Sequence, residues 1–127
     1  MSSWLFLHLN NGKYGKDLKE QLISEKNHAE LWKAHTNPNF NAEPKSPYKT
    51  HFEAYGLGWF LSDVNGHIKV EHTGGLPGML SRTILIPELN VGIVVLTNTD
   101  PGGLSYIRLL RKVWKPILEQ KEKTGSQ

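Results

Sequence analysis

The side chains of this sequence that could carry chemistry are six histidines, 12 carboxylates and scattered hydroxyls. Cysteine is absent, which excludes disulfides and thiolate metal sites. The histidines show no metal-ligand spacing with a second histidine or a carboxylate, so we expect neither a metal nor another cofactor. The run Asp63-Val64-Asn65-Gly66 has some features of a calcium loop, but a two-residue hairpin turn explains it fully. No serine has a histidine or lysine partner that the sequence can place, and we nominate no nucleophile.

The remaining candidate is the run His72-Thr73-Gly74-Gly75. A histidine by itself is more often a half-exposed strand residue than a catalytic group. The two glycines, together with Pro77 and Gly78, could simply connect two strands.

Four apolar runs surround this candidate and must position it. Residues rich in glycine, proline, asparagine and aspartate separate them, which predicts an antiparallel meander over residues 55–98. The runs are Leu57–Leu61, His67–His72, Leu80–Ile86 and Val91–Thr97. Tyr55 and Trp59, at the start of this stretch, are expected to pack in the core rather than to stack on a substrate.

Helices are expected at both ends of the chain. Residues 3–10 form a short helix that Asn10-Asn11-Gly12 stops, and a second helix begins after Ser24 as its N-cap and ends near His35. The stretch 36–53 contains three prolines and no period, which predicts a loop. Apolar residues recurring at three and four positions predict a C-terminal helix over residues 101–120, with Pro116 kinking it.

A chain of 127 residues is long enough for one domain, and we expect a single domain over residues 1–127. Its predicted fold class is α+β: an antiparallel sheet of about four strands, the C-terminal helix packed on it, and residues 1–54 supplying two short helices and a loop. The net charge of +3 is spread along the chain, which argues against nucleic acid as a partner. No apolar run approaches the roughly 20 residues that a membrane span needs.

The last predicted strand has an unusual composition for its position. Val91–Thr97 is apolar on both faces, as in a central strand covered on both sides, yet it ends the meander. A long apolar free edge promotes aggregation unless another strand pairs with it. We therefore expect that something further, absent from this predicted meander, pairs beside this strand.

In its context the candidate motif resembles the serine β-lactamase and penicillin-binding-protein-like family, and most closely its class C-like hydrolases and esterases. The residues that carry the resemblance are His72-Thr73-Gly74-Gly75, preceded by Tyr55-Gly-Leu-Gly-Trp59 and followed by Gly78. It continues through Ile86–Asn98 and upstream through residues 9–16 and 22–26, so it spans nearly the whole chain.

The resemblance implies a role for each residue of the motif. His72 takes the basic position of the third signature motif, Thr73 the hydroxyl position that holds a substrate carboxylate or carbonyl, and Gly74 the small position. The backbone N–H of Gly75 would be one of two oxyanion-hole donors. The implied activity is acyl transfer to a serine and then hydrolysis, on a β-lactam, a D-alanyl peptide or a small ester.

The sequence departs from the family at the nucleophile. The family's Ser-x-x-Lys motif lies far upstream at the start of a buried helix, and nothing here occupies that place. Ser46-Pro47-Tyr48-Lys49 matches literally but lies in a proline-broken stretch, and Lys123-Thr124-Gly125 lies in a polar tail. We therefore expect the C-terminal part of a larger hydrolase that is inactive alone.

Two alternatives of other classes stay open: a module that completes another chain's sheet, and a cell-wall binding domain. The family is typically periplasmic or secreted in bacteria, but this chain does not fix the compartment.

Overall fold

A computed structural model of the chain describes residues 1–36, 39–45, 49–98, 112–113 and 116. The chain divides into two compact units. The first comprises Met1–Thr73 with Arg82–Val94, and the second comprises Gly74–Ser81 with the described residues of Val95–Gln127. The long strands β6, β7 and β8 each contribute to both units.

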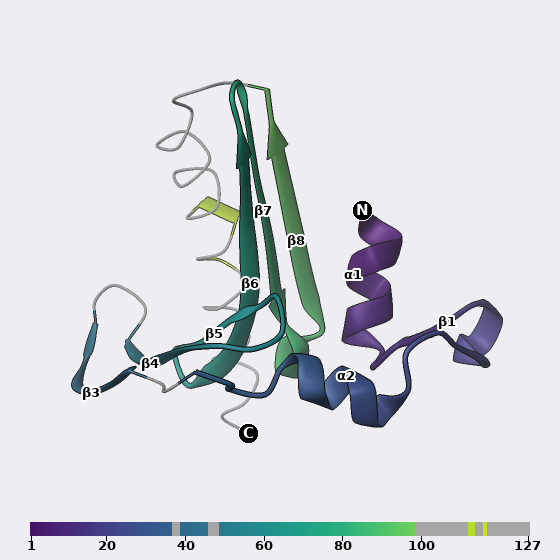
Figure 1. Ribbon diagram of the computed structural model, residues 1–127, viewed down its shortest axis with the longest axis horizontal. Helices are drawn as coiled ribbons and strands as arrows, with labels where there is room; N and C mark the ends of the chain where they lie inside the picture. Colours follow the sequence, from purple (N-terminus) through teal and green to yellow (C-terminus); the bar gives the residue numbers. More distant parts are fainter. Residues whose placement is uncertain (37–38, 46–48, 99–111, 114–115, 117–127) are drawn as a thin grey trace. The chain divides into compact units, whose positions relative to one another are not determined.

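The described residues form two α-helices, two short 3-10 helices and two sheets (Figure 1). The N-terminal elements are α1 (Ser2–Leu9), β1 (Lys13–Tyr14), η1 (Lys16–Leu18), β2 (Glu20–Gln21) and α2 (Glu25–Leu31). They are followed by β3 (Asn39–Lys45), β4 (Thr50–Tyr55), β5 (Phe60–Val64), β6 (His67–Leu76), β7 (Met79–Ile86), η2 (Pro87–Leu89) and β8 (Val91–Thr97). Strands β1 and β2 pair with each other, and the other six form one sheet in chain order, from β3 to β8.

The α+β class and the two short N-terminal helices are confirmed. Helix α1 ends where Asn11 and Gly12 take positive φ values of 53° and 85°. Helix α2 begins after Ser24, whose Oγ accepts a hydrogen bond from the Asn27 amide at 3.2 Å. It ends at Leu31, earlier than predicted. The Leu31 carbonyl there accepts a hydrogen bond from the Leu57 amide at 3.0 Å, a long-range contact that local sequence does not reveal.

The prediction of a loop over residues 36–53 is wrong. This stretch contains β3 and most of β4, which pair antiparallel with Phe40 opposite Phe52. Its prolines misled the prediction, because Pro44 lies in β3, a terminal strand of the described sheet, where a missing amide is tolerated. The sheet therefore has six strands rather than about four.

The predicted meander is present, with changed boundaries. Asn65 and Gly66, with φ of 47° and 83°, form the predicted two-residue turn between β5 and β6. Strand β5 begins at Phe60 rather than Leu57, because Gly58 turns the chain with a φ of 80°. Strand β6 extends beyond the predicted His72 to Leu76, so the connection to β7 shrinks to Pro77 and Gly78.

The core of the first unit lies between helix α1 and the sheet. Its buried members come from α1, β4 to β7 and the β4–β5 connection: Leu5, Ala54, Trp59, Leu61, Val70 and Leu85. Gly92 of β8 lies so close to α1 that a Cβ there would be 3.2 Å from the Leu5 Cβ. The prediction that Trp59 packs in the core is confirmed, since it is 7% exposed.

The predicted C-terminal helix over 101–120 lies mostly outside the described residues. Lys112, Val113 and Pro116 are described and are helical. Within the described part of the chain, no helix combines the length and the apolar character needed to cross a bilayer.

Candidate functional site

The four motif residues lie in succession on β6, near the end of the strand. The paired ladder between β5 and β6 ends at Phe60 opposite Glu71, one residue before His72. His72 and Thr73 are both exposed. The motif thus lies on the part of β6 that extends past its pairing with β5, with its side chains accessible from solvent.

His72 on β6 is held by two aromatic residues, Tyr55 of β4 and Phe60 of the adjacent strand β5. The Tyr55 hydroxyl lies 3.3 Å from the His72 Nε2. The Phe60 ring stacks on the imidazole with centroids 5.7 Å apart and an interplanar angle of 29°. Tyr55 and Phe60 also contact each other edge to face at 4.7 Å.

These contacts differ from the prediction that Tyr55 packs in the core. Tyr55 and Phe60 occupy opposed positions on β4 and β5. A tyrosine paired across a hairpin from a phenylalanine, with a strand histidine next in the sheet, is the pattern that could have suggested an aromatic clamp on His72.

Gly74 and Gly75 are extended strand residues in the second unit rather than parts of the turn. Gly78 supplies the positive φ of the turn, at 80°. A Cβ on Gly74 would lie 2.5 Å from the Ser81 Oγ, whereas a Cβ on Gly75 would meet only the Leu80 Cδ2, at 3.5 Å. Both glycines line an apolar hollow of about 330 Å³ within this unit.

Next to His72 in sequence, Glu71 lies in a compact ion-pair cluster on the sheet. Its Oε1 accepts a hydrogen bond from the Lys69 Nζ at 2.7 Å, and its Oε2 accepts from the Arg82 Nε at 2.9 Å. Burial raises the pKa of Glu71, but Lys69 and Arg82 outweigh burial and lower it overall. Glu71 is therefore a neutralised carboxylate whose two oxygens are both engaged.

A hollow of about 410 Å³ in the first unit is lined in part by Lys69 and Glu71 of this cluster. Its walls come from β4, β5 and β6 and include Tyr55, Phe60, Ser62 and Lys69. Two of these residues, Tyr55 and Phe60, also contact His72. The space on this side of the sheet is therefore bordered by the residues that hold the histidine.

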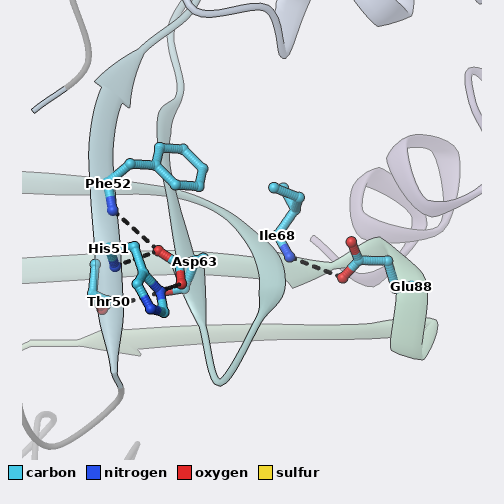
Figure 2. A network of polar contacts seen from close by, with 6 residues as sticks. All are labelled: Thr50, His51, Phe52, Asp63, Ile68 and Glu88. Atoms are coloured by element: carbon cyan, nitrogen blue, oxygen red, sulfur yellow. Dashed lines mark hydrogen bonds and ion pairs between the residues drawn. The ribbon is translucent and has the colours of Figure 1, made fainter. Parts of the chain in front are cut away.

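Asp63 forms a second polar network, on the hairpin of β4 and β5 (Figure 2). Its Oδ1 accepts hydrogen bonds from the His51 and Phe52 amides at 2.7 and 3.2 Å, and its Oδ2 lies 2.6 Å from the His51 Nδ1. Burial raises the pKa of Asp63, but these hydrogen bonds from His51 and Phe52 lower it overall. The carboxylate thereby replaces backbone pairing and fixes β4 on β5.

A third cluster lies between the two helices. His8 and His28 are 1% and 2% exposed, and the His8 Nδ1 lies 3.1 Å from the His28 Nε2. The indole rings of Trp4, Trp32 and Trp59 contact His8. Burial, and then the charge of His28, lower the pKa of His8 to about 4. This pair is neutral at pH 7 and packs as part of the core.

The described residues offer no group of three or more ligating side chains for a metal ion. The literal Ser-x-x-Lys match is only partly described, since Ser46 lies outside the described residues. Lys49 lies in a turn before β4 with a φ of 52°, which is not a helical conformation. The tail residues Lys123-Thr124-Gly125 also lie outside the described residues.

Comparison with known proteins identifies one family. The family model described as Beta-lactamase matches residues 1–114, which include every residue of the candidate motif. No curated protein and no solved structure matches the chain.

Proposed function

The chain belongs to the beta-lactamase family, and from that premise we propose that it supplies one wall of a serine hydrolase active site. The whole site would transfer an acyl group from a β-lactam, a D-alanyl peptide or a small ester to a serine and then hydrolyse the acyl-enzyme. The wall is the end of β6, with His72, Thr73, Gly74 and Gly75.

The strand conformation of β6 through Gly75 carries this proposal. A strand offers a fixed amide to a developing oxyanion, and a glycine lets the substrate approach that amide closely. The Gly75 N–H is the proposed oxyanion donor. His72 contributes a hydrogen bond or a charge near the leaving group, and Thr73 binds a carboxylate or carbonyl of the substrate.

The proposal also holds that these 127 residues have no turnover by themselves. Residues that bind the substrate and stabilise the oxyanion cannot replace a nucleophile, because the acyl-enzyme forms only on an activated serine. The turn conformation of Lys49 supports this view, since a serine and a lysine three residues apart face each other only on a helix.

The test is a covalent-labelling and turnover assay on the full chain. We expect no hydrolysis of a chromogenic β-lactam or an aryl ester above that of His72→Ala, and no acyl adduct by intact-mass spectrometry after incubation with a penicillin. Turnover abolished by His72→Ala, or a stoichiometric adduct on a serine that Ser46→Ala removes, would contradict the proposal.

A second candidate function is that of a module that completes a sheet with another chain. It is favoured by β8, which is a terminal strand of the described sheet and carries the apolar run Val91–Thr97. The proposed partners are an N-terminal part of the hydrolase and a second copy of this chain. Light scattering over a range of protein concentrations tests the second of these.

A further inference from the structure

The contact between Tyr55 and His72 defines which atom of the imidazole can serve a substrate. We propose that Tyr55 is a positioning residue whose hydroxyl donates a hydrogen bond to the His72 Nε2, so that the neutral imidazole carries its proton on Nδ1. This inference rests on the role proposed for His72. It adds the tautomer and the group that the substrate must present.

The direction of the hydrogen bond follows from the chemistry of the two groups. The Tyr55 oxygen and the His72 Nε2 are 3.3 Å apart. A phenol has an acidic O–H, and the unprotonated nitrogen of a neutral imidazole is a good acceptor. The favoured arrangement has the phenol donating to Nε2, and this leaves the ring proton on Nδ1.

A carboxylate beside the histidine would produce the opposite arrangement, because it would accept the ring N–H. Glu71 is the neighbouring carboxylate in sequence, but both of its oxygens are occupied by Lys69 and Arg82. In the described part of the chain, the His72 ring forms a hydrogen bond with the Tyr55 hydroxyl. A neutral donor therefore sets the tautomer here.

The Phe60 ring fixes the plane in which this hydrogen bond forms. It stacks on the imidazole at 29° and meets the Tyr55 ring at 69°. Intermediate rotations of His72 about its χ2 angle would lose the stacking on Phe60, and a 180° flip would keep the ring plane but break the bond to Tyr55. The two aromatic residues thus hold the ring nitrogens in fixed places before any substrate arrives.

The consequence for substrate choice is specific. With Nε2 occupied by Tyr55, the Nδ1–H is the donor that remains. It requires an acceptor, a carbonyl or carboxylate oxygen, on the substrate or leaving group. When His72 is protonated, Nε2–H donates to the Tyr55 oxygen, which accepts, and Nδ1–H remains available as a donor. The same geometry therefore serves both charge states.

The test is long-range proton–nitrogen NMR correlation on the ¹⁵N-labelled full chain in alkaline buffer, where free imidazole is neutral. The missing signals of His72→Gln assign the His72 ring. We expect the Nδ1–H tautomer to dominate in the unsubstituted chain, and Tyr55→Phe to shift the tautomer ratio toward Nε2–H by about fivefold, as expected for one net hydrogen bond. Tyr14→Phe, on the remote strand β1, is the matched control and should leave the ratio unchanged.

Dominance of the Nε2–H tautomer in the unsubstituted chain would overturn the proposal, even if Tyr55→Phe failed to fold. An unchanged ratio in a folded Tyr55→Phe would overturn it as well. These outcomes are separate from the failure of the proposed function. The NMR experiment measures the His72 tautomer whether or not the chain hydrolyses a substrate. The hydrolase proposal is tested separately, by acyl labelling and turnover.

Discussion

The buried carboxylate of Asp63 holds β4 against β5. Asp63 is 5% exposed and accepts hydrogen bonds from two backbone amides and one imidazole. A buried carboxylate is tolerated only when its oxygens are satisfied, and here three donors satisfy them. Since the same donors lower the pKa of Asp63, the residue stays ionised at pH 7.

Asp63→Ala should therefore destabilise the chain by about 2–4 kcal/mol, because it removes the buried carboxylate that accepts hydrogen bonds from the His51 and Phe52 amides. Asp63→Asn keeps one oxygen and should cost about half as much. Urea unfolding at pH 7 measures both differences. Glu30→Ala, at an exposed residue of α2, is the control and should change the free energy of unfolding by less than about 0.5 kcal/mol. Equal effects of Asp63→Ala and Glu30→Ala would contradict this role.

At the scale of elements, the packing of α1 against α2 depends on two neutral histidines. His8 and His28 are almost fully buried and lie within hydrogen-bond distance of each other. The His8 Nε2 and the Trp32 Nε1 have no hydrogen-bond partner among the described residues. Burial lowers the pKa of both histidines. Protonating the pair would place positive charge among three indole rings, in a region with little solvent.

This arrangement predicts that the free energy of unfolding decreases as the pH is lowered across a defined range. The pKa of His8 is about 4 in the folded chain and 6.5 when unfolded, so the unfolded state binds more protons between these values. Stability is full above pH 6.5 and is lost as the pH falls toward 4. The loss is about 3 kcal/mol from His8, since each pKa unit corresponds to roughly 1.4 kcal/mol.

Urea unfolding at a series of pH values, followed by tryptophan fluorescence, measures this slope. His8→Phe should reduce the slope by more than half, leaving the contribution of His28. A slope that is the same in His8→Phe and in the unsubstituted chain would show that other groups titrate in this window.

For the molecule as a whole, the sheet ends at β8 among the described strands. On one face Gly92 lies against Leu5 of α1, and within the second unit Leu96 is 64% exposed. A strand with this composition and a free hydrogen-bonding edge pairs readily with another strand. The net charge of +3 is small for a chain of this length and opposes such pairing only weakly.

We expect the chain to self-associate as its concentration rises, and Val95→Lys to weaken that association by about tenfold or more, because the charge would be buried at the new strand pair. Light scattering over a range of concentrations measures both. Ile68→Lys places the same charge on β6 at an exposed residue and should leave the mass unchanged. A monomeric mass at every concentration would contradict pairing between copies.

Local sequence determined the features of this protein that depend on neighbouring residues. Asn65-Gly66 specified a tight hairpin because both residues accept positive φ. Ser24 specified the start of α2 because its hydroxyl reaches an amide three residues on. The order and spacing of the motif around His72 indicated the family, which the match over residues 1–114 confirms.

Only the tertiary structure decided the features that depend on distant residues. Strands β3 and β4 form despite three prolines in their region because each has a partner strand. Helix α2 ends at Leu31 because the Leu57 amide donates a hydrogen bond to the Leu31 carbonyl. Tyr55 was expected in the core, but strand register places its hydroxyl beside His72. Contacts between residues 17 to 26 positions apart leave no local pattern, and so their effects on His72 and α2 could be found only in the folded chain.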